Sequence, residues 1–78
     1  MPKTFFGKEV VKILCRDFGF HFVSQKGSHA KLVRKIDKRK IITIVPMHKE
    51  LARGTFKGVL RLAQVEEEDF KKNIKTKS

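Results

Sequence analysis

The side chain of this sequence best suited to chemistry is His29, which ends the run Gly27-Ser28-His29. Glycine permits a bend and a serine hydroxyl suits a turn, so the run is expected to form the turn of a β-hairpin. Histidine is the one side chain that both takes and gives a proton near neutral pH. His29 is therefore a candidate general acid or base, although in an arbitrary sequence a plain residue at a strand end is the more common role.

A general base at this position suggests cleavage of RNA. Once its proton is removed, the 2′-hydroxyl of RNA attacks the adjacent 3′-phosphate, a reaction that requires positioning, a proton acceptor and nearby cations. DNA lacks this hydroxyl and would be spared. The run from Lys31 to Lys40 holds six cations and only Asp37 as an acid, a density that favours phosphate binding but also fits a solvated strand face. The predicted RNA-binding residues are Lys26, Lys31, Arg34, Lys35, Lys38, Arg39 and Lys40.

The other candidates for chemistry carry a weaker signal. His48 lies at the end of a predicted strand, just after Pro46, where it could be a second acid or base, a phosphate contact, or a loop residue without a role. His21 is expected in the middle of a strand and is the weakest of the three histidines. Because the histidines lack paired spacing and Cys15 is the only cysteine, the sequence predicts no metal site and no cofactor. Cys15 itself is expected to be a core or near-core thiol.

Length and charge limit the class of protein. With 78 residues, the chain is expected to form one domain over residues 1–78, with an ordered core from about residue 5 to about residue 71. Nineteen Lys and Arg against eight Asp and Glu give a net charge of +11, which attracts phosphate polymers, anionic membranes or acidic proteins. The sequence has neither an apolar run of transmembrane length nor the hydrophobic run of a signal peptide, so a cytoplasmic protein without membrane contact is expected.

Apolar spacing predicts helices on either side of three strands. A first amphipathic helix is expected over residues 7–17, stopping at Gly19, with Thr4 as the nearest N-cap. Strands are expected over residues 20–23, 30–36 and 40–46, followed by a loop over 47–53, a helix over 54–63, and a short third helix from 66 that leads into a Lys-rich, fraying tail over 71–78. On the second strand, alternation sends Ala30, Leu32 and Ile36 inward and His29, Lys31, Val33 and Lys35 outward.

The order of helix, three antiparallel strands and helix predicts an α+β sandwich in which both helices cover one face of the sheet. Such an arrangement resembles the double-stranded RNA-binding domain. A likeness at the level of the fold says nothing about chemistry, which must be argued from the residues of a site.

Four segments carry a closer resemblance: Phe20–Leu32 (FHFVSQKGSHAKL), Ile44–His48 (IVPMH), Gly54–Leu60 (GTFKGVL) and Glu67–Phe70 (EEDF). In this order they resemble the HicA (YcfA-like) family of bacterial and archaeal toxin ribonucleases, over nearly the whole chain. A Gly-Ser-His triplet after a strand, combined with Pro-x-His and a Gly-Thr helix start, is far more specific than any one of these parts.

The resemblance implies a fold like that of the double-stranded RNA-binding domain, metal-independent cleavage of mRNA, and control by a cognate HicB-type antitoxin that blocks the active site. In the family the histidine of Gly-Ser-His is catalytic, which corresponds to His29 here, and Gly27 and Ser28 would position it. His48 matches a histidine common in the family and is a candidate contributor. Phe6 stands where the family often has a small polar helix cap, so it bears on where the first helix begins.

Two other functions fit the same sequence. A non-catalytic RNA-binding module would use Lys and Arg to grip an RNA helix by its shape and phosphates. Such a module would shift labelled RNA on a gel and leave it intact in the presence of EDTA, whereas a ribonuclease would cut it. An adaptor for an acidic partner protein would form a stable complex and have no affinity for RNA.

Overall fold

The computed structural model describes residues 5–75 of the chain. The elements, in chain order, are β1 (Phe5–Phe6), α1 (Gly7–Asp17), β2 (His21–Lys26), β3 (His29–Ile36), β4 (Arg39–Pro46), β5 (Glu50–Leu51), α2 (Arg53–Ala63) and α3 (Glu67–Lys75). The α+β class and the helix, three strands, helix order are those predicted from the sequence. Thr4, the predicted N-cap, lies outside the described residues.

Helix α1 confirms the predicted bounds. It begins without a polar N-cap side chain, and instead the Phe6 N–H donates a hydrogen bond of 3.0 Å to Glu9 Oε1, which stabilises the first turn. At the other end Gly19 adopts a φ of +76°, in the left-handed region that glycine enters without strain, and the Phe20 N–H donates to the Leu14 carbonyl at 3.2 Å. Phe6 stands where a small polar cap is common in the family, but the helix still begins at Gly7, as the apolar pattern predicted.

The main sheet is antiparallel, in the order β2-β3-β4. The β2–β3 turn consists of Gly27 and Ser28, and the glycine has a φ of +60°, as the first position of a tight hairpin turn requires. Strand β2 begins one residue later than the strand predicted over residues 20–23, and it is longer. His21 is consequently the first residue of β2 and not a mid-strand residue, while Phe20, which was predicted to lie in the strand, is buried before it.

A second, two-stranded sheet was not predicted. Within the segment expected to be a loop, β5 pairs antiparallel with β1, so that Phe5 lies opposite Leu51 and Phe6 opposite Glu50. Phe5 and Leu51 are both buried in the core. This pairing fixes the chain that follows β4, which carries part of the candidate site.

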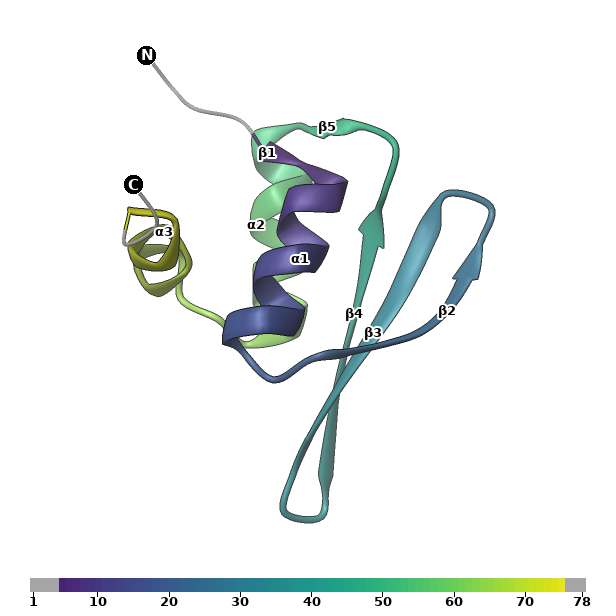
Figure 1. The fold of residues 1–78 in the computed structure, drawn as a ribbon, viewed down its shortest axis with the longest axis vertical. Helices are drawn as coiled ribbons and strands as arrows, with labels where there is room; N and C mark the ends of the chain where they lie inside the picture. Colours follow the sequence, from purple (N-terminus) through teal and green to yellow (C-terminus); the bar gives the residue numbers. More distant parts are fainter. Residues whose placement is uncertain (1–4, 76–78) are drawn as a thin grey trace.

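Helices α1 and α2 lie on one face of the main sheet, as predicted (Figure 1). Across this inner face the Thr43 hydroxyl of β4 donates a buried hydrogen bond of 2.9 Å to the Val59 carbonyl of α2. We call the other face the open face; by register and side-chain alternation it carries His21, Ser24, Lys26, His29, Lys31, Val33, Lys35, Lys40, Ile42, Ile44 and Pro46. Ile42 and Ile44 are 39% and 38% exposed, since none of the elements within residues 5–75 covers them.

The β3–β4 hairpin extends beyond the ends of the helices (Figure 1). At a rise of about 3.3 Å per residue, its turn at Asp37-Lys38 lies about 25 Å along β3 from His29. Ile36 lies on the inward face that alternation predicts, but it is 38% exposed and not part of the core, because the helices do not reach this end of the hairpin.

Helix α3 closes the core on the side of the helices away from the sheet (Figure 1). Phe70 is fully buried, and its ring packs against the rings of Phe5 and Phe56 at centroid distances of 5.7 and 5.4 Å. The helix continues to Lys75, so the segment from Lys71 to Lys75, predicted to fray, is helical; residues 76–78 lie outside the described part. None of the helices within residues 5–75 is long and apolar enough to cross a membrane.

Candidate functional site

His29 lies where the main sheet meets the β2–β3 turn. It is the first residue of β3, opposite Lys26 on β2 and Pro46 on β4, and its side chain is exposed. The ring is therefore accessible to a large substrate. A tight turn followed at once by a paired residue holds the backbone beneath the ring in one position.

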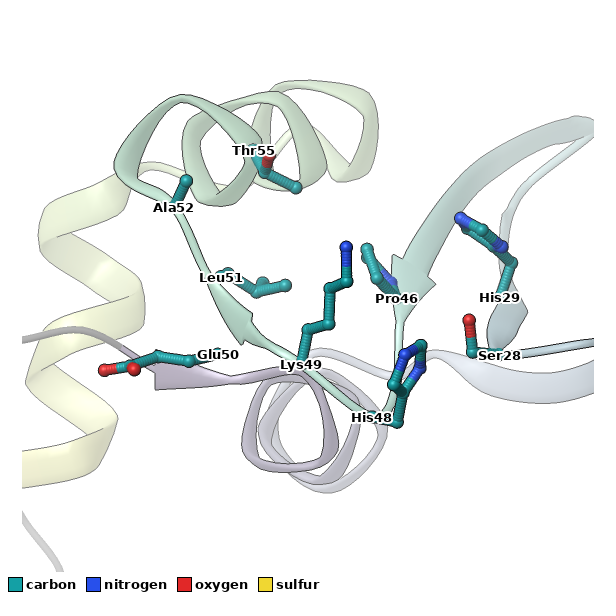
Figure 2. Close-up of a pocket in the computed structure, with 9 residues that line it drawn as sticks. All are labelled: Ser28, His29, Pro46, His48, Lys49, Glu50, Leu51, Ala52 and Thr55. Carbon is teal, nitrogen blue, oxygen red and sulfur yellow. The ribbon is translucent and has the colours of Figure 1, made fainter.

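The candidate site is a pocket of about 420 Å³ between this end of the sheet and the start of α2 (Figure 2). A cavity of this size falls within the range of small-ligand sites, roughly 300–1,000 Å³. It brings His29 and His48 together with Ser28, which are three of the residues singled out from the sequence. The full lining is Ser28, His29, Pro46, His48, Lys49, Glu50, Leu51, Ala52 and Thr55.

Two backbone hydrogen bonds fix the segment that carries His48. The Met47 N–H donates to the Ser28 carbonyl at 2.6 Å, which ties the end of β4 to the β2–β3 turn. The Gly7 N–H donates to the Lys49 carbonyl at 2.9 Å, which ties the same segment to the start of α1. His48 lies between these two anchors, just beyond the end of β4, so the position predicted for it at the end of the third strand is close to the observed one.

Gly7 is the residue that allows this close approach. A Cβ at position 7 would lie 1.7 Å from the carbonyl oxygen of Pro46 and 2.9 Å from the Cα of Met47. Both are backbone atoms on the segment that leads to His48, so they cannot move aside as a flexible side chain would.

Gly7→Ala is accordingly expected to destabilise the protein by about 1–3 kcal/mol, the usual cost of overpacking, and to displace the pocket wall. Gly58→Ala is the matched control: it lies within α2 with no atom within 4 Å of the new Cβ, and should stabilise the helix by about 0.5–1 kcal/mol. Urea unfolding of both variants measures the effect. Equal stability of the two variants would contradict the close approach.

A second hollow, of about 360 Å³, lies on the open face and shares His29 with the pocket. Its other lining residues are Ser24 and Lys26 from β2, Lys31 from β3 and Ile44 from β4. His29 therefore forms part of the wall between two hollows. A chain of nucleotides crossing this end of the sheet would have room on both sides of the imidazole.

The structure divides the predicted RNA-binding cations into three groups. Lys26, Lys31, Lys35 and Lys40 lie on the open face with His29, and Lys35 is paired directly across from Lys40. Like charges facing each other destabilise a sheet, so an anion bound between them would offset the repulsion. Lys38 and Arg39 lie at the far turn of the β3–β4 hairpin. Arg34 belongs to the inner face, where its Nε would lie 3.8 Å from a Cβ built at Gly19, so it does not share a face with His29.

Sequence reasoning did not select Lys49 or Leu51 for this site. Both line the pocket only because the β1–β5 pairing and the Gly7 contact direct the chain back past the sheet. The one local signal for Lys49 is its place directly after Pro-x-His, and the run of cations at residues 31–40 is a denser signal for phosphate binding. Thr55, noted in the sequence only as part of a helix start, also lines the pocket.

The remaining candidates lie apart from the pocket. Cys15 packs against the core, and burial raises the pKa of its thiol, which keeps it protonated and a poor nucleophile. His21 lines neither hollow. Among the described residues there is no group of three or more His, Cys, Asp or Glu side chains that could hold a metal ion.

Comparison with known proteins gave one family. The model of the HicA toxin of bacterial toxin-antitoxin systems matches residues 7–65, which is most of the chain. This match confirms the resemblance found in the sequence, and its range includes every residue that lines either hollow. No curated protein and no solved structure gives a significant match.

Proposed function

Because the chain belongs to the HicA toxin family, whose members are toxins of toxin-antitoxin pairs, we propose that it is a metal-independent endoribonuclease that cleaves mRNA with His29 as the proton-transfer residue. The observation that carries the proposal is the position of His29: an exposed imidazole on the wall between two hollows, with a second histidine in the same pocket. The basic open face supplies the attraction for a polyanion.

The proposed reaction is transesterification within the RNA strand. A neutral nitrogen of His29 accepts the proton of a ribose 2′-hydroxyl, and the 2′-oxygen attacks the adjacent phosphorus. The bond from phosphorus to the 5′-oxygen of the next nucleotide then breaks, and that oxygen takes a proton. The products are a 2′,3′-cyclic phosphate and a 5′-hydroxyl end, so no outside nucleophile is consumed in this step.

The neighbours of His29 have distinct proposed roles. Gly27 forms the turn that presents the ring, and the Ser28 carbonyl holds the segment that carries His48 through the Met47 N–H. His48 lies in the same pocket and is proposed as the donor of a proton to the leaving 5′-oxygen. The roles of His29 and His48 both depend on the hydrogen bond between Met47 and Ser28, which holds the two histidines at a fixed distance from each other.

Cleavage of a labelled RNA in the presence of EDTA tests the proposal. We expect the RNA to be cut, with 2′,3′-cyclic phosphate ends, while the 2′-O-methyl RNA and the DNA of the same sequence remain intact because neither offers a free 2′-hydroxyl. An RNA that is shifted on a gel but stays intact would favour the non-catalytic RNA-binding module. A protein that neither binds nor cuts RNA would contradict both.

The open-face pair Lys35 and Lys40 gives a separate prediction about binding. The double variant Lys35→Gln/Lys40→Gln should raise KM for a long RNA and leave kcat nearly unchanged, because both residues lie outside the pocket. The slope of log affinity against log salt should become shallower by roughly 0.7 for each phosphate that the variant no longer binds. The double variant Lys8→Gln/Lys12→Gln, on the exposed side of α1, makes the same charge change away from the open face. Equal salt slopes in the two double variants would contradict the assignment.

Family membership also implies an antitoxin partner. We propose a HicB-type antitoxin with an acidic surface that covers His29, since such a surface would neutralise the open face and exclude RNA at once. With mRNA as the proposed substrate, the proposed location is the cytoplasm. Coexpression with the neighbouring reading frame should restore growth that the toxin alone inhibits.

A further inference from the structure

Lys49 is the one Lys or Arg among the residues that line the pocket beside His29. The seven cations chosen from the sequence do not line this pocket: Lys26 and Lys31 line the second hollow, which shares His29, and the other five line neither. We infer, on the basis of the proposed function, that Lys49 binds the phosphate group at the RNA bond that is cut. The basic run at residues 31–40 would then hold more distant parts of the RNA.

The charges around the pocket favour an anion. Figure 2 shows the Lys49 side chain extended into the pocket, with its amino group between Pro46 and the first turn of α2. The only carboxylate of the lining belongs to Glu50, and in the same view it points away from the lysine. Among the residues that the structure describes, Lys49 forms no ion pair. Its charge is therefore directed into the cavity without being neutralised there.

The backbone of Lys49 is held in place, which distinguishes it from a lysine on a free loop. Its carbonyl accepts the hydrogen bond from the Gly7 N–H at 2.9 Å, and the next two residues form β5, paired with β1. Only the side chain remains to be ordered when a ligand binds. The entropic cost of binding is correspondingly lower than for a lysine whose backbone must also be fixed.

The proposed reaction needs a cation at this place. As the 2′-oxygen attacks, the phosphate passes through a phosphorane that carries more negative charge on its non-bridging oxygens than the ground state does. An ammonium group offers three donors and a full charge to these oxygens. Lys49 shares its pocket with His29 and His48, so the charge that stabilises the phosphorane and the groups that move protons would act on one phosphodiester.

The alternative is that Lys49 is a surface lysine whose aliphatic stem covers Pro46 and Leu51 while its amino group stays in water.

Titration of labelled protein with adenosine 3′-monophosphate, followed by NMR, distinguishes a phosphate-binding Lys49 from a surface lysine. Wild type should show saturable shifts at Ser28, His29 and Lys49. Lys49→Gln should weaken binding by about tenfold, the worth of one charge-assisted contact, and Lys49→Arg by less. Lys12→Gln, an exposed lysine of α1, is the matched control and should have less than about a twofold effect.

Kinetics with a short RNA give the second readout. Lys49→Gln should lower kcat by roughly a hundredfold and raise KM by up to about tenfold, the loss expected for the nucleotide, because its contact strengthens further as charge develops on the phosphorane. The inference would be overturned if Lys49→Gln bound the nucleotide as tightly as wild type does. It would also be overturned if wild type showed no saturable binding in the pocket. If wild type binds through Lys49 but cuts no RNA, the proposed function fails and the phosphate site stands.

Discussion

His29→Gln is expected to slow RNA cleavage by about 10²–10⁴-fold, the usual contribution of a positioned acid or base. Glutamine keeps a polar side chain of similar size but cannot take the proton of the 2′-hydroxyl. Because His29 is exposed, the free energy of unfolding should change by less than about 0.5 kcal/mol. The rate constant for a defined RNA, with unfolding measured on the same sample, checks both statements.

His21→Gln is the matched control for this variant, since it removes another exposed histidine of the main sheet that lines neither hollow. It should cleave at the wild-type rate. Equal rates of RNA cleavage by His29→Gln and His21→Gln would show that His29 takes no part in the reaction.

An RNA with sulfur in place of the leaving 5′-oxygen distinguishes the roles of His29 and His48, because a sulfur leaving group needs no proton. This substrate should restore the rate of His48→Gln but not that of His29→Gln.

Phe70→Ala is expected to destabilise the protein by about 3–5 kcal/mol, the cost of removing a fully buried ring. Phe70 joins α3 to the core, with ring contacts to Phe5, Phe56 and Phe18. A chain of this size has a total stability of only about 4–12 kcal/mol, so a large fraction of the variant should be unfolded at moderate denaturant concentration.

Leu62→Ala provides the comparison for Phe70→Ala. Leu62 is an apolar residue of α2 that is 54% exposed, so its truncation should change stability by no more than about 0.5 kcal/mol. Denaturant unfolding of the two variants, fitted with a common slope, gives the difference directly. Coinciding midpoints would mean that α3 does not pack against the core through Phe70. The result also matters because α3 lies beyond the range matched by the family, residues 7–65.

Local patterns were sufficient for the elements whose signals lie within one stretch of chain. The apolar spacing of α1 and the glycine after it indicated both ends of that helix, and the turn at Gly27 was predicted because glycine enters a positive φ without strain. The pairing of β1 with β5 could not be found in this way. Each strand has two residues, and what joins them is burial of Phe5 and Leu51 in a core assembled from the whole chain.

The same distinction explains the two instructive differences in the sheet and the site. Alternation placed Ile36 on the correct face, but whether a helix covers that face depends on how far the hairpin extends beyond α1 and α2. Lys49 was missed because its place in the pocket depends on a hydrogen bond to Gly7, which is distant in sequence. The position of His29 beside the hairpin turn could be predicted because turn chemistry and strand pattern lie within one stretch of chain, whereas its catalytic role stays a prediction.

If the protein cleaves RNA as proposed, the extended β3–β4 hairpin affects what happens after the bond is cut. An RNA bound at His29 would also reach Lys35, Lys40 and the cations of the far turn, so that many phosphates would share the attraction. Cleavage at His29 would separate these phosphates into two pieces, neither of which would keep the whole set of interactions. The protein would then bind its products more weakly than its substrate, which would allow repeated turnover without any moving part.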